Sequence, residues 1–433
     1  MWPLALGMMN NAVLQFTDRA LLARESMASL EAVLPAGMLA YIALGFFQSV
    51  VAYSGTFVAQ YFGAKDLTMC RRSYHAGVWL ALASGVAMLA ALPLGDLVFE
   101  TFSNGADVIA RQKTYYGICT AGGVFLFGQM AVQAYFTGLG KTRIILWVNV
   151  IGNALNIALD VVMIFGRLGC PRMGIAGAAY ATVIATFAQW AILAIAAHRE
   201  NRGTRVRLLD RELVPLVWRI LRFGVPSGAY SVLNSLSFTI FVFFTGAVGH
   251  VAAAVSNACF SVCYLLFAPM EGVALGASAL VGRCRGAKDE DEAMRTGMRT
   301  VLIGVVFAAV ASIAVLVLRH PILALYAPSE PAAAEEFHAL GAMLFVLMAM
   351  WQVFDAADVI VSGALKGAGD TKFVMWWMLL IAFAMWMPLV WVVSRVHNTM
   401  PTLWGTMLLY VVVLCVGSLI RWRRGGWKRI RMV

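Results

Sequence analysis

The sequence predicts an all-α polytopic membrane protein with twelve transmembrane helices in two homologous six-helix lobes. Three observations lead to this prediction: an apolar composition, twelve long hydrophobic runs, and sequence blocks that recur in the two halves of the chain. Of the 433 residues, 61% are hydrophobic and 13% are charged, and the mean hydropathy is +0.79. Soluble domains contain about 45–50% apolar and about 25% charged residues. The composition therefore excludes a soluble enzyme.

The hydrophobic runs have the length of membrane-spanning helices. A helix needs about 20 apolar residues to cross the hydrocarbon core, whereas strands of a membrane barrel are about ten residues long with alternating polarity. The first six predicted helices cover residues 1–23, 33–62, 73–95, 115–137, 143–166 and 174–197. The second six cover residues 217–248, 252–283, 297–319, 337–365, 372–394 and 399–421. All twelve runs are too long and too uniformly apolar to be barrel strands.

The two sets of six helices are related by an internal repeat. The block Gly63-Ala64-Lys65-Asp66 recurs as Gly286-Ala287-Lys288-Asp289, at an offset of 223 residues. A second block, residues 137–143, recurs as residues 366–372. An even number of spans in each unit makes this a parallel repeat, related by an axis along the membrane normal. Two lobes around a central cleft are typical of an alternating-access transporter.

These boundaries divide the chain into four segments. The N-terminal lobe covers residues 1–197, a basic linker covers 198–222, the C-terminal lobe covers 217–421, and a basic tail covers 422–433. The connections after even-numbered helices, counted with the helix ends that flank them and with the tail, hold 25 of the 33 Lys and Arg residues. Because basic loops stay in the cytoplasm, both termini are predicted to be cytoplasmic. The net charge of +11 then reflects topology and contact with anionic lipid headgroups rather than binding to nucleic acid.

Polar side chains inside the spans mark the candidate functional sites, since ionisable residues are costly in hydrocarbon. Asn149, Asn153, Asn156 and Asp160 fall within about 60° of one another at about 100° per residue, so they line one face of a helix. Other polar residues of the same half are Asn11, Gln15, Asp18, Gln133 and Thr182. We expect a hydrated polar chamber centred on Asp18 and Asp160. Keeping two adjacent carboxylates ionised at the same time costs free energy, so such a pair suits a proton carrier. An interhelical hydrogen-bond clamp remains the structural alternative.

The C-terminal half carries a different set of polar residues. Asp355 and Asp358 lie on one face of residues 337–365, and Glu271 lies in the span 252–283. At the repeat offset, Phe241 replaces Asp18 and Leu389 replaces Asp160. The halves have therefore diverged, and a second cation site or a site for cationic substrates at Glu271, Asp355, Asp358 and Asn234 remains open.

Several of these motifs together resemble the multidrug and toxic compound extrusion (MATE) family. The resemblance rests on Asp18, on residues 58–64, on Asn153, Asn156 and Asp160 followed by residues 174–179, and on residues 363–371. It implies a V-shaped bundle of two six-helix lobes that exports organic cations or other amphiphiles in exchange for H⁺ or Na⁺. Within the family the chain is most similar to the DNA-damage-inducible protein F type, whose acids match Asp18 and Asp160. Gln133 and Thr182 occupy roughly the positions of other chamber residues of that branch.

Three features depart from or qualify the resemblance. The other prokaryotic branch carries a Glu where this chain has Asn234, which puts that branch's Na⁺ site in doubt, although Asp355 matches its other acid. Pro3 matches a proline at which the first helix of the family bends, and little helix precedes it. We therefore expect that the start of this sequence is trimmed or has been placed too far along the chain, so that part of the first helix is missing.

The sequence thus predicts a secondary active multidrug antiporter of the bacterial inner membrane. Asp18 and Asp160 form the predicted protonatable pair, with Asn153 and Asn156 as their hydrogen-bond partners. We expect a monomer without an organic cofactor or bound metal, H⁺ or Na⁺ as coupling ion, and small cationic or amphiphilic substrates. A lipid-linked precursor flippase is the alternative, although it would need a basic cleft. An intramembrane aspartyl enzyme is the remote alternative.

Overall fold

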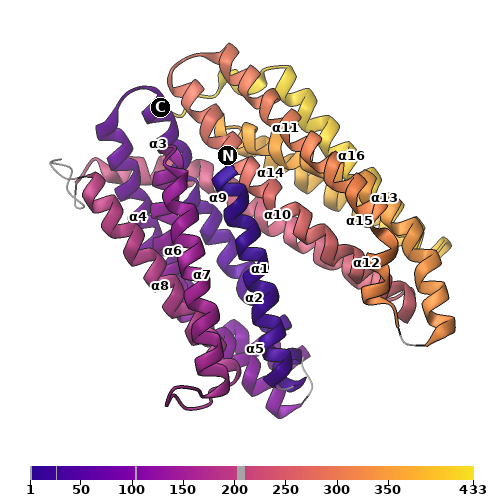
Figure 1. Ribbon diagram of the computed structural model, residues 1–433. Coiled ribbons are helices and arrows are strands. Elements are labelled where there is room, and N and C mark those ends of the chain that lie inside the picture. Colours follow the sequence, from indigo (N-terminus) through magenta and orange to yellow (C-terminus); the bar gives the residue numbers. More distant parts are fainter. Residues whose placement is uncertain (1, 26, 103–104, 202–209, 329) are drawn as a thin grey trace. The chain divides into compact units, whose positions relative to one another are not determined.

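The computed structural model of the protein describes residues 2–25, 27–102, 105–201, 210–328 and 330–433. Within them, all regular secondary structure is helical (Figure 1). The chain forms two compact units. The N-terminal unit is essentially Leu6–Gly228, and the C-terminal unit is essentially Ala229–Arg285 with Asp289–Arg431. The lobe boundaries given above stay a prediction, and residues 202–209 of the predicted linker lie outside the described residues.

Sixteen α-helices were assigned in the described residues. The first eight are α1 (Trp2–Glu25), α2 (Met27–Ala52), α3 (Ser54–Gly63), α4 (Leu67–Leu89), α5 (Leu92–Phe102), α6 (Ala106–Gly138), α7 (Thr142–Phe165) and α8 (Ile175–Glu200). The others are α9 (Leu213–Gly246), α10 (His250–Gly286), α11 (Glu290–Val317), α12 (Arg319–Tyr326), α13 (Pro331–Gly367), α14 (Thr371–Leu379), α15 (Met387–Val396) and α16 (Met400–Arg423).

These helices account for the twelve predicted spans. By length and hydropathy, ten segments of the described chain can cross a membrane, and the bent pair α4 and α5 brings the number to eleven. The remaining span is α1, which is 24 residues long but carries a row of polar side chains. The predicted all-α, twelve-helix fold is confirmed.

Three predicted spans are interrupted rather than continuous. The span 33–62 consists of α2 and α3, which meet at Tyr53, and the span 73–95 bends by 41° between α4 and α5. The span 372–394 contains a π-helical turn, Leu380–Trp386, between α14 and α15. Pro388 lies two residues after the end of that turn and has no backbone N–H to donate. A proline breaks the regular i to i−4 bonding of a helix, which accounts for the wider turn at this place.

The internal repeat is visible in the geometry of its two matching turns. Lys65 and Lys288 both adopt a left-handed backbone conformation, with φ of 61° and 60°. The residue after each lysine caps the next helix. Asp66 accepts a hydrogen bond from the Met69 N–H at 2.9 Å, and Asp289 accepts one from the Glu292 N–H at 2.9 Å. The same four residue types thus build the same helix–turn–helix connection in each half of the chain.

Glycines bring two helices of each unit into backbone contact. A Cβ atom added to Gly138 of α6 would lie 2.8 Å from the Gly55 carbonyl oxygen of α3. The repeat counterpart of Gly138 is Gly367 of α13, where an added Cβ atom would lie 2.3 Å from the Ser278 carbonyl oxygen of α10. Small residues allow such close approach between membrane helices. Both units therefore contain the same tight crossing at equivalent positions.

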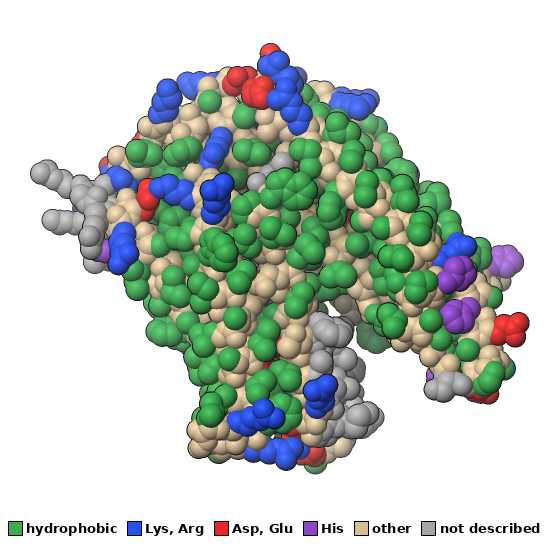
Figure 2. All heavy atoms as spheres, viewed as in Figure 1, with side chains coloured by type: hydrophobic (Ala, Val, Ile, Leu, Met, Phe, Trp, Pro, Cys, Tyr) green, Lys and Arg blue, Asp and Glu red, His purple; other side chains and the backbone are tan. Residues whose placement is uncertain are grey.

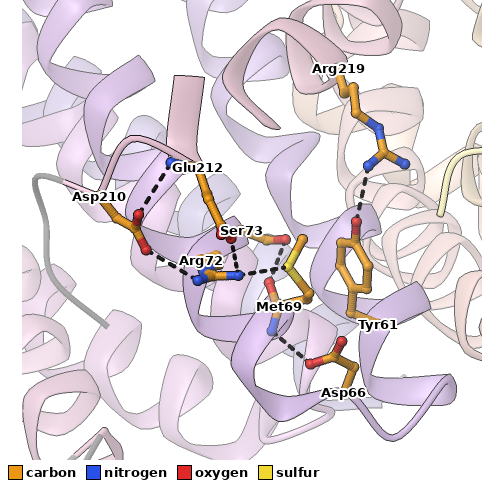
Figure 3. Close-up of polar contacts among 8 residues, drawn as sticks. All are labelled: Tyr61, Asp66, Met69, Arg72, Ser73, Asp210, Glu212 and Arg219. Atoms are coloured by element: carbon orange, nitrogen blue, oxygen red, sulfur yellow. Dashed lines mark hydrogen bonds and ion pairs between the residues drawn. The ribbon is translucent and has the colours of Figure 1, made fainter. Parts of the chain in front are cut away.

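The segment that leads into α9 is anchored to the start of α4 (Figure 3). Arg72 forms ion pairs with Asp210, at 3.3 Å, and with Glu212. Nearby, the Tyr61 hydroxyl accepts a hydrogen bond from Arg219 of α9 at 3.3 Å. Glu212 is 65% exposed, so its ion pair with Arg72 is of the solvent-screened kind that contributes little stability. These contacts fix the entry of α9 into the N-terminal unit and lie apart from the polar residues of the chamber.

The outer surface of the protein is rich in exposed apolar side chains. Hydrophobic side chains cover much of the face seen in Figure 2, and many of its Lys and Arg side chains lie near helix ends. Large apolar residues such as Val86, Phe243 and Leu325 are more than 70% exposed. Exposed apolar area of this extent marks a surface that contacts something other than water, here the lipid bilayer.

Candidate functional site

The predicted polar stripe of α7 faces the interior of the N-terminal unit. Asn149, Asn153, Asn156 and Asp160 are all at most 7% exposed, and Asp160 is completely buried. Their spacing keeps them on one side of the helix, where α1, α6 and α8 supply hydrogen-bond partners. Buried polar groups are expensive in hydrocarbon unless they are paired. The stripe therefore forms the core of an internal polar cluster.

The two predicted coupling acids meet in this cluster. Asp18 of α1 interacts with Asp160 of α7 both through charge and through a side-chain hydrogen bond. A hydrogen bond between two carboxyl groups requires a proton on one of them. The Asp160 Oδ1 atom is buried and has no hydrogen-bond partner among the described residues. The arrangement thus suits a pair that holds one proton between two acids.

Asn156 connects this acid pair to α8. With its amide oriented to match its neighbours, Asn156 donates a hydrogen bond to Asp160 Oδ2 at 2.7 Å and accepts one from the Thr182 backbone N–H at 3.2 Å. The Thr182 hydroxyl donates to the Ala178 carbonyl oxygen at 3.0 Å. Asn156 and Thr182 therefore hold the Asp160 carboxyl group in place.

Asn153 takes part in a separate chain of amides. It donates to Asn11 of α1 at 3.0 Å, and its own oxygen accepts from Gln189 of α8 at 3.3 Å. Gln189 in turn accepts from Gln129 of α6 at 2.6 Å. The bonds of Asn153 thus go to other amides rather than to the two acids. This chain links four helices around the chamber, namely α1, α6, α7 and α8.

A further bond of the same kind joins Gln133 to the cluster, because Gln133 donates to the Asn149 Oδ1 atom at 3.0 Å. Gln15, by contrast, is exposed. Tyr115 of α6 lies close enough to both Asp18 and Asp160 to interact with them electrostatically, and it hydrogen-bonds to Cys119. Tyr115 could not be predicted as a member of this site, since one tyrosine among many aromatic residues carries no signal of its position.

The amide chain can be tested by removing its central member. Gln189→Leu leaves Gln129 without its acceptor and Asn153 without its donor, and unpaired buried polar groups cost about 1–3 kcal/mol each in water-soluble proteins and less within membranes. We expect the variant to be destabilised by about 1–2 kcal/mol in thermal unfolding of the detergent-solubilised protein.

Gln352 of α13 provides a matched control with the opposite expected sign. It is 1% exposed, and neither of its amide atoms has a hydrogen-bond partner among the described residues. Replacing it with leucine removes two unsatisfied groups, so Gln352→Leu should be neutral or stabilising. Equal stability losses in the two variants would contradict the amide chain.

The C-terminal unit contains a second polar cluster, which we call the C-unit charge cluster. It consists of Glu271, Asp355, Asp358 and Lys366. Asp358 is buried and accepts a hydrogen bond from the Ser418 hydroxyl of α16 at 2.8 Å. Asp355 interacts electrostatically with Asp358 and Glu271. The exposed Glu271 side chain completes the acidic part of the cluster.

Lys366 is the member of this cluster that the sequence analysis did not include. The predicted span 337–365 leaves Lys366 in the turn that follows it. In the structure α13 continues to Gly367, so Lys366 lies in its last turn. The ammonium group of Lys366 lies 3.7 Å from the centre of the Tyr230 ring and interacts electrostatically with Asp358 and Glu271. The assignment of Lys366 to the turn was therefore wrong.

Asn234, the remaining predicted residue, does not join the cluster through its side chain. It is exposed on α9, and its backbone carbonyl oxygen accepts a hydrogen bond from Ser237. The structure therefore brings together Glu271, Asp355 and Asp358 but adds no bond from Asn234.

Apolar helices in two units, each with charged and polar groups gathered inside it, define a polytopic protein of the membrane-transporter class. A family model described as MatE matches residues 3–162 and again residues 226–392, so the chain belongs to the MatE family. The two matches begin 223 residues apart, which is the repeat offset found in the sequence. Assignment to the DNA-damage-inducible protein F branch stays a prediction.

Several curated proteins are similar to the chain along most of its length. The probable multidrug resistance protein NorM of Bradyrhizobium diazoefficiens is 26% identical over 395 residues, which cover 90% of this chain and 84% of that protein. The corresponding protein of Thermotoga maritima is 28% identical over 320 residues, which cover 72% and 67%. An outward-facing structure of a multidrug resistance MATE family transporter has the same fold. Its TM-score is 0.85 at 19% identity, over 99% of this chain and 95% of that one.

Proposed function

We propose that this protein is a secondary active exporter that moves small cationic or amphiphilic compounds out of the cell in exchange for protons. Membership of the MatE family and similarity to proteins named for multidrug resistance support the export of multiple compounds. The contact between Asp18 and Asp160 supports protons as the coupling ion. We assign Asp18 and Asp160 to coupling, with Asn156 as the residue that holds Asp160. Asn153, Gln133 and Thr182 belong to the surrounding chamber.

The mechanism follows from the charge of the acid pair. Without a bound proton, the buried Asp160 carboxylate and the half-buried Asp18 carboxylate repel each other. A proton shared between them removes that repulsion. Because Asp18 lies on α1 and Asp160 on α7, binding and release of the proton change how tightly these helices pack. A ligand shifts a conformational equilibrium when it binds one state better than the other. A proton and a substrate that favour opposite access states are thus exchanged across the membrane.

The orientation follows from the distribution of basic residues. Because most Lys and Arg residues lie in connections after even-numbered helices, we propose that both termini face the cytoplasm. The bacterial relatives support the inner membrane as the location. We further propose that the protein works as a monomer, since each polar cluster is completed within one chain.

Flipping of a lipid-linked precursor fits the charge distribution less well. A pyrophosphate group would need several basic side chains, such as bidentate arginines. The basic member of the C-unit charge cluster, Lys366, already interacts with two acids. The cluster carries three acids to one lysine, which favours cations.

A gradient experiment with purified protein tests the proposal. Proteoliposomes that contain the wild-type protein are loaded with ethidium. Efflux is then recorded under an imposed pH gradient, under a sodium gradient, and without a gradient. We expect efflux with the pH gradient alone and no added effect of sodium. Efflux that requires sodium would contradict proton coupling and move the ion site to Asp355 and Asp358. Absence of efflux under every gradient would contradict the exporter and make the flippase the next function to test.

A further inference from the structure

The C-unit charge cluster occupies positions that are neutral in the other half of the chain. At the repeat offsets, Gln48 corresponds to Glu271, Gln129 to Asp358, and Thr137 to Lys366. Two acids and a lysine in one half thus replace two amides and a hydroxyl in the other. Since Lys366 interacts with both acids, the three residues form one unit rather than three separate changes.

The helical geometry brings Lys366 back toward the acids of its own helix. At about 100° per residue, Asp355, Asp358 and Lys366 fall within about 80° of one another on α13. A long side chain on a helix points toward the N-terminus of that helix, which for Lys366 is the direction of Asp358. The tight crossing described above holds α10 against this part of α13: an added Cβ atom at Gly363 would lie 2.5 Å from the Ala274 carbonyl oxygen. Ala274 is one turn from Glu271, so the crossing keeps Glu271 near Lys366.

The surroundings of Lys366 are those of a bound cation. Its ammonium group lies over the Tyr230 ring at 3.7 Å, a geometry that attracts cations through the ring quadrupole. Tyr230 also interacts electrostatically with Asp355, Asp358 and Glu271. An aromatic face beside carboxylates is the chemistry that recognises organic ammonium and similar cations. The lysine therefore occupies the kind of site that a cationic substrate would need.

We propose that Lys366 is a tethered cation that competes with positively charged substrates for the carboxylates of Glu271 and Asp358 and for the face of Tyr230. This inference rests on the proposed export function and adds a specificity-determining residue to it. A monovalent organic cation binds in the C-terminal unit by displacing the lysine ammonium group, whereas a neutral compound gains nothing from doing so. Lys366 thus weakens the binding of cations and prevents them from remaining on the acids.

Binding of ethidium to purified full-length protein, followed by its fluorescence, tests this competition. Lys366→Met removes the charge but keeps an unbranched side chain, and we expect it to bind ethidium at least about tenfold more tightly than the wild type, given the strength of close charge pairs. Lys366→Arg keeps the charge and should bind like the wild type. Lys141→Met provides a matched control, because Lys141 is exposed and paired with Glu200 at 2.6 Å, so its removal should leave affinity unchanged.

The other half of the chain supplies the variant that removes the whole unit. Glu271→Gln, Asp358→Gln and Lys366→Thr together introduce the residues found at Gln48, Gln129 and Thr137. This triple variant should lose the gain in ethidium affinity, because the two carboxylates for which the lysine and the substrate compete are both gone. Persistence of tight ethidium binding in the triple variant would overturn the proposal, as would unchanged affinity in a folded Lys366→Met protein.

Affinity and efflux report separately on the two proposals. Tighter ethidium binding in Lys366→Met together with absence of gradient-driven efflux would support the tethered cation and contradict the exporter. Normal efflux with equal affinity in Lys366→Met and wild type would contradict the tethered cation alone. A protein that binds no ethidium with or without Lys366 would also overturn the tethered cation.

Discussion

Asp160→Asn is expected to lower export driven by a pH gradient by at least about tenfold, because an amide cannot bind and release a proton at the site where the carboxyl group did. Asparagine has nearly the same shape and can still accept a hydrogen bond from Asn156. The variant should therefore fold and bind substrate, and the loss should appear in coupling. The measurement is the initial rate of ethidium efflux from proteoliposomes at matched protein content, with substrate affinity determined in parallel.

Two further variants make this result specific to the acid pair. Asp18→Asn should lose a similar fraction of the activity, and the double variant should lose little more than either single variant, since groups that act as a unit are not additive. Asp107→Asn is the control: Asp107 is 68% exposed at the start of α6 and pairs with Arg111 of the same helix at 2.9 Å. Wild-type efflux in Asp160→Asn, or an equal loss in Asp107→Asn, would remove the acid pair from the coupling mechanism.

The sequence was sufficient to locate this pair because helical periodicity is regular. The spacing of Asn149, Asn153, Asn156 and Asp160 places them on one side of α7 whatever the neighbours are. In hydrocarbon such a stripe has to face the interior of the protein. The meeting of Asp18 with Asp160 could thus be predicted from two helices that were each polar on one side only. The sequence could not predict that Asn156 holds the acid pair whereas Asn153 joins a separate chain of amides. This difference depends on side-chain contacts between helices.

Lys366 shows where a sequence motif misleads. The repeat of residues 137–143 at residues 366–372 correctly predicts a turn, and Gly140 and Gly369 both have positive φ, at 68° and 95°. The motif does not define the last helical residue, since helix ends vary by one or two residues. Two further residues of α13 change Lys366 from a loop residue into a helical residue that interacts with Asp358. Tyr230 and Ser418, which come from α9 and α16, were likewise hidden because their role depends on which helices pack together.

Some local irregularities of the helices can be predicted from the residue type, and others depend on how the helices pack. At Pro388 the residue type itself accounts for the disturbance of the span 372–394, because proline removes a backbone donor. The bend between α4 and α5 has such a residue as well, because Pro93 is the second residue of α5. The break at Tyr53 has none, so its position depends on how α3 packs on α4 and α6, which is a property of the folded unit.

The contact between α3 and α6 leads to the second large effect, which concerns stability rather than transport. Gly138→Ala is expected to destabilise the protein by about 1–3 kcal/mol, because overpacking a close contact forces the backbone to shift. The added Cβ atom would lie 2.6 Å from Val58 Cβ and 2.8 Å from the Gly55 carbonyl oxygen. Neither the backbone oxygen nor the branched Val58 side chain can move away without separating the two helices. Thermal unfolding in detergent, monitored at a fixed protein concentration, measures the effect.

Gly117 of the same helix makes the comparison sharp, since a Cβ atom added there would meet nothing within 4 Å. Alanine loses less backbone entropy on folding than glycine, so Gly117→Ala should stabilise the protein by up to about 1 kcal/mol. The two variants change the same residue type, in one helix, by one methyl group. Opposite signs can then come only from the space around each Cβ atom. A stable Gly138→Ala protein would mean that α3 and α6 can separate without cost, and the matching crossing at Gly367 could no longer be taken to hold Glu271 near Lys366.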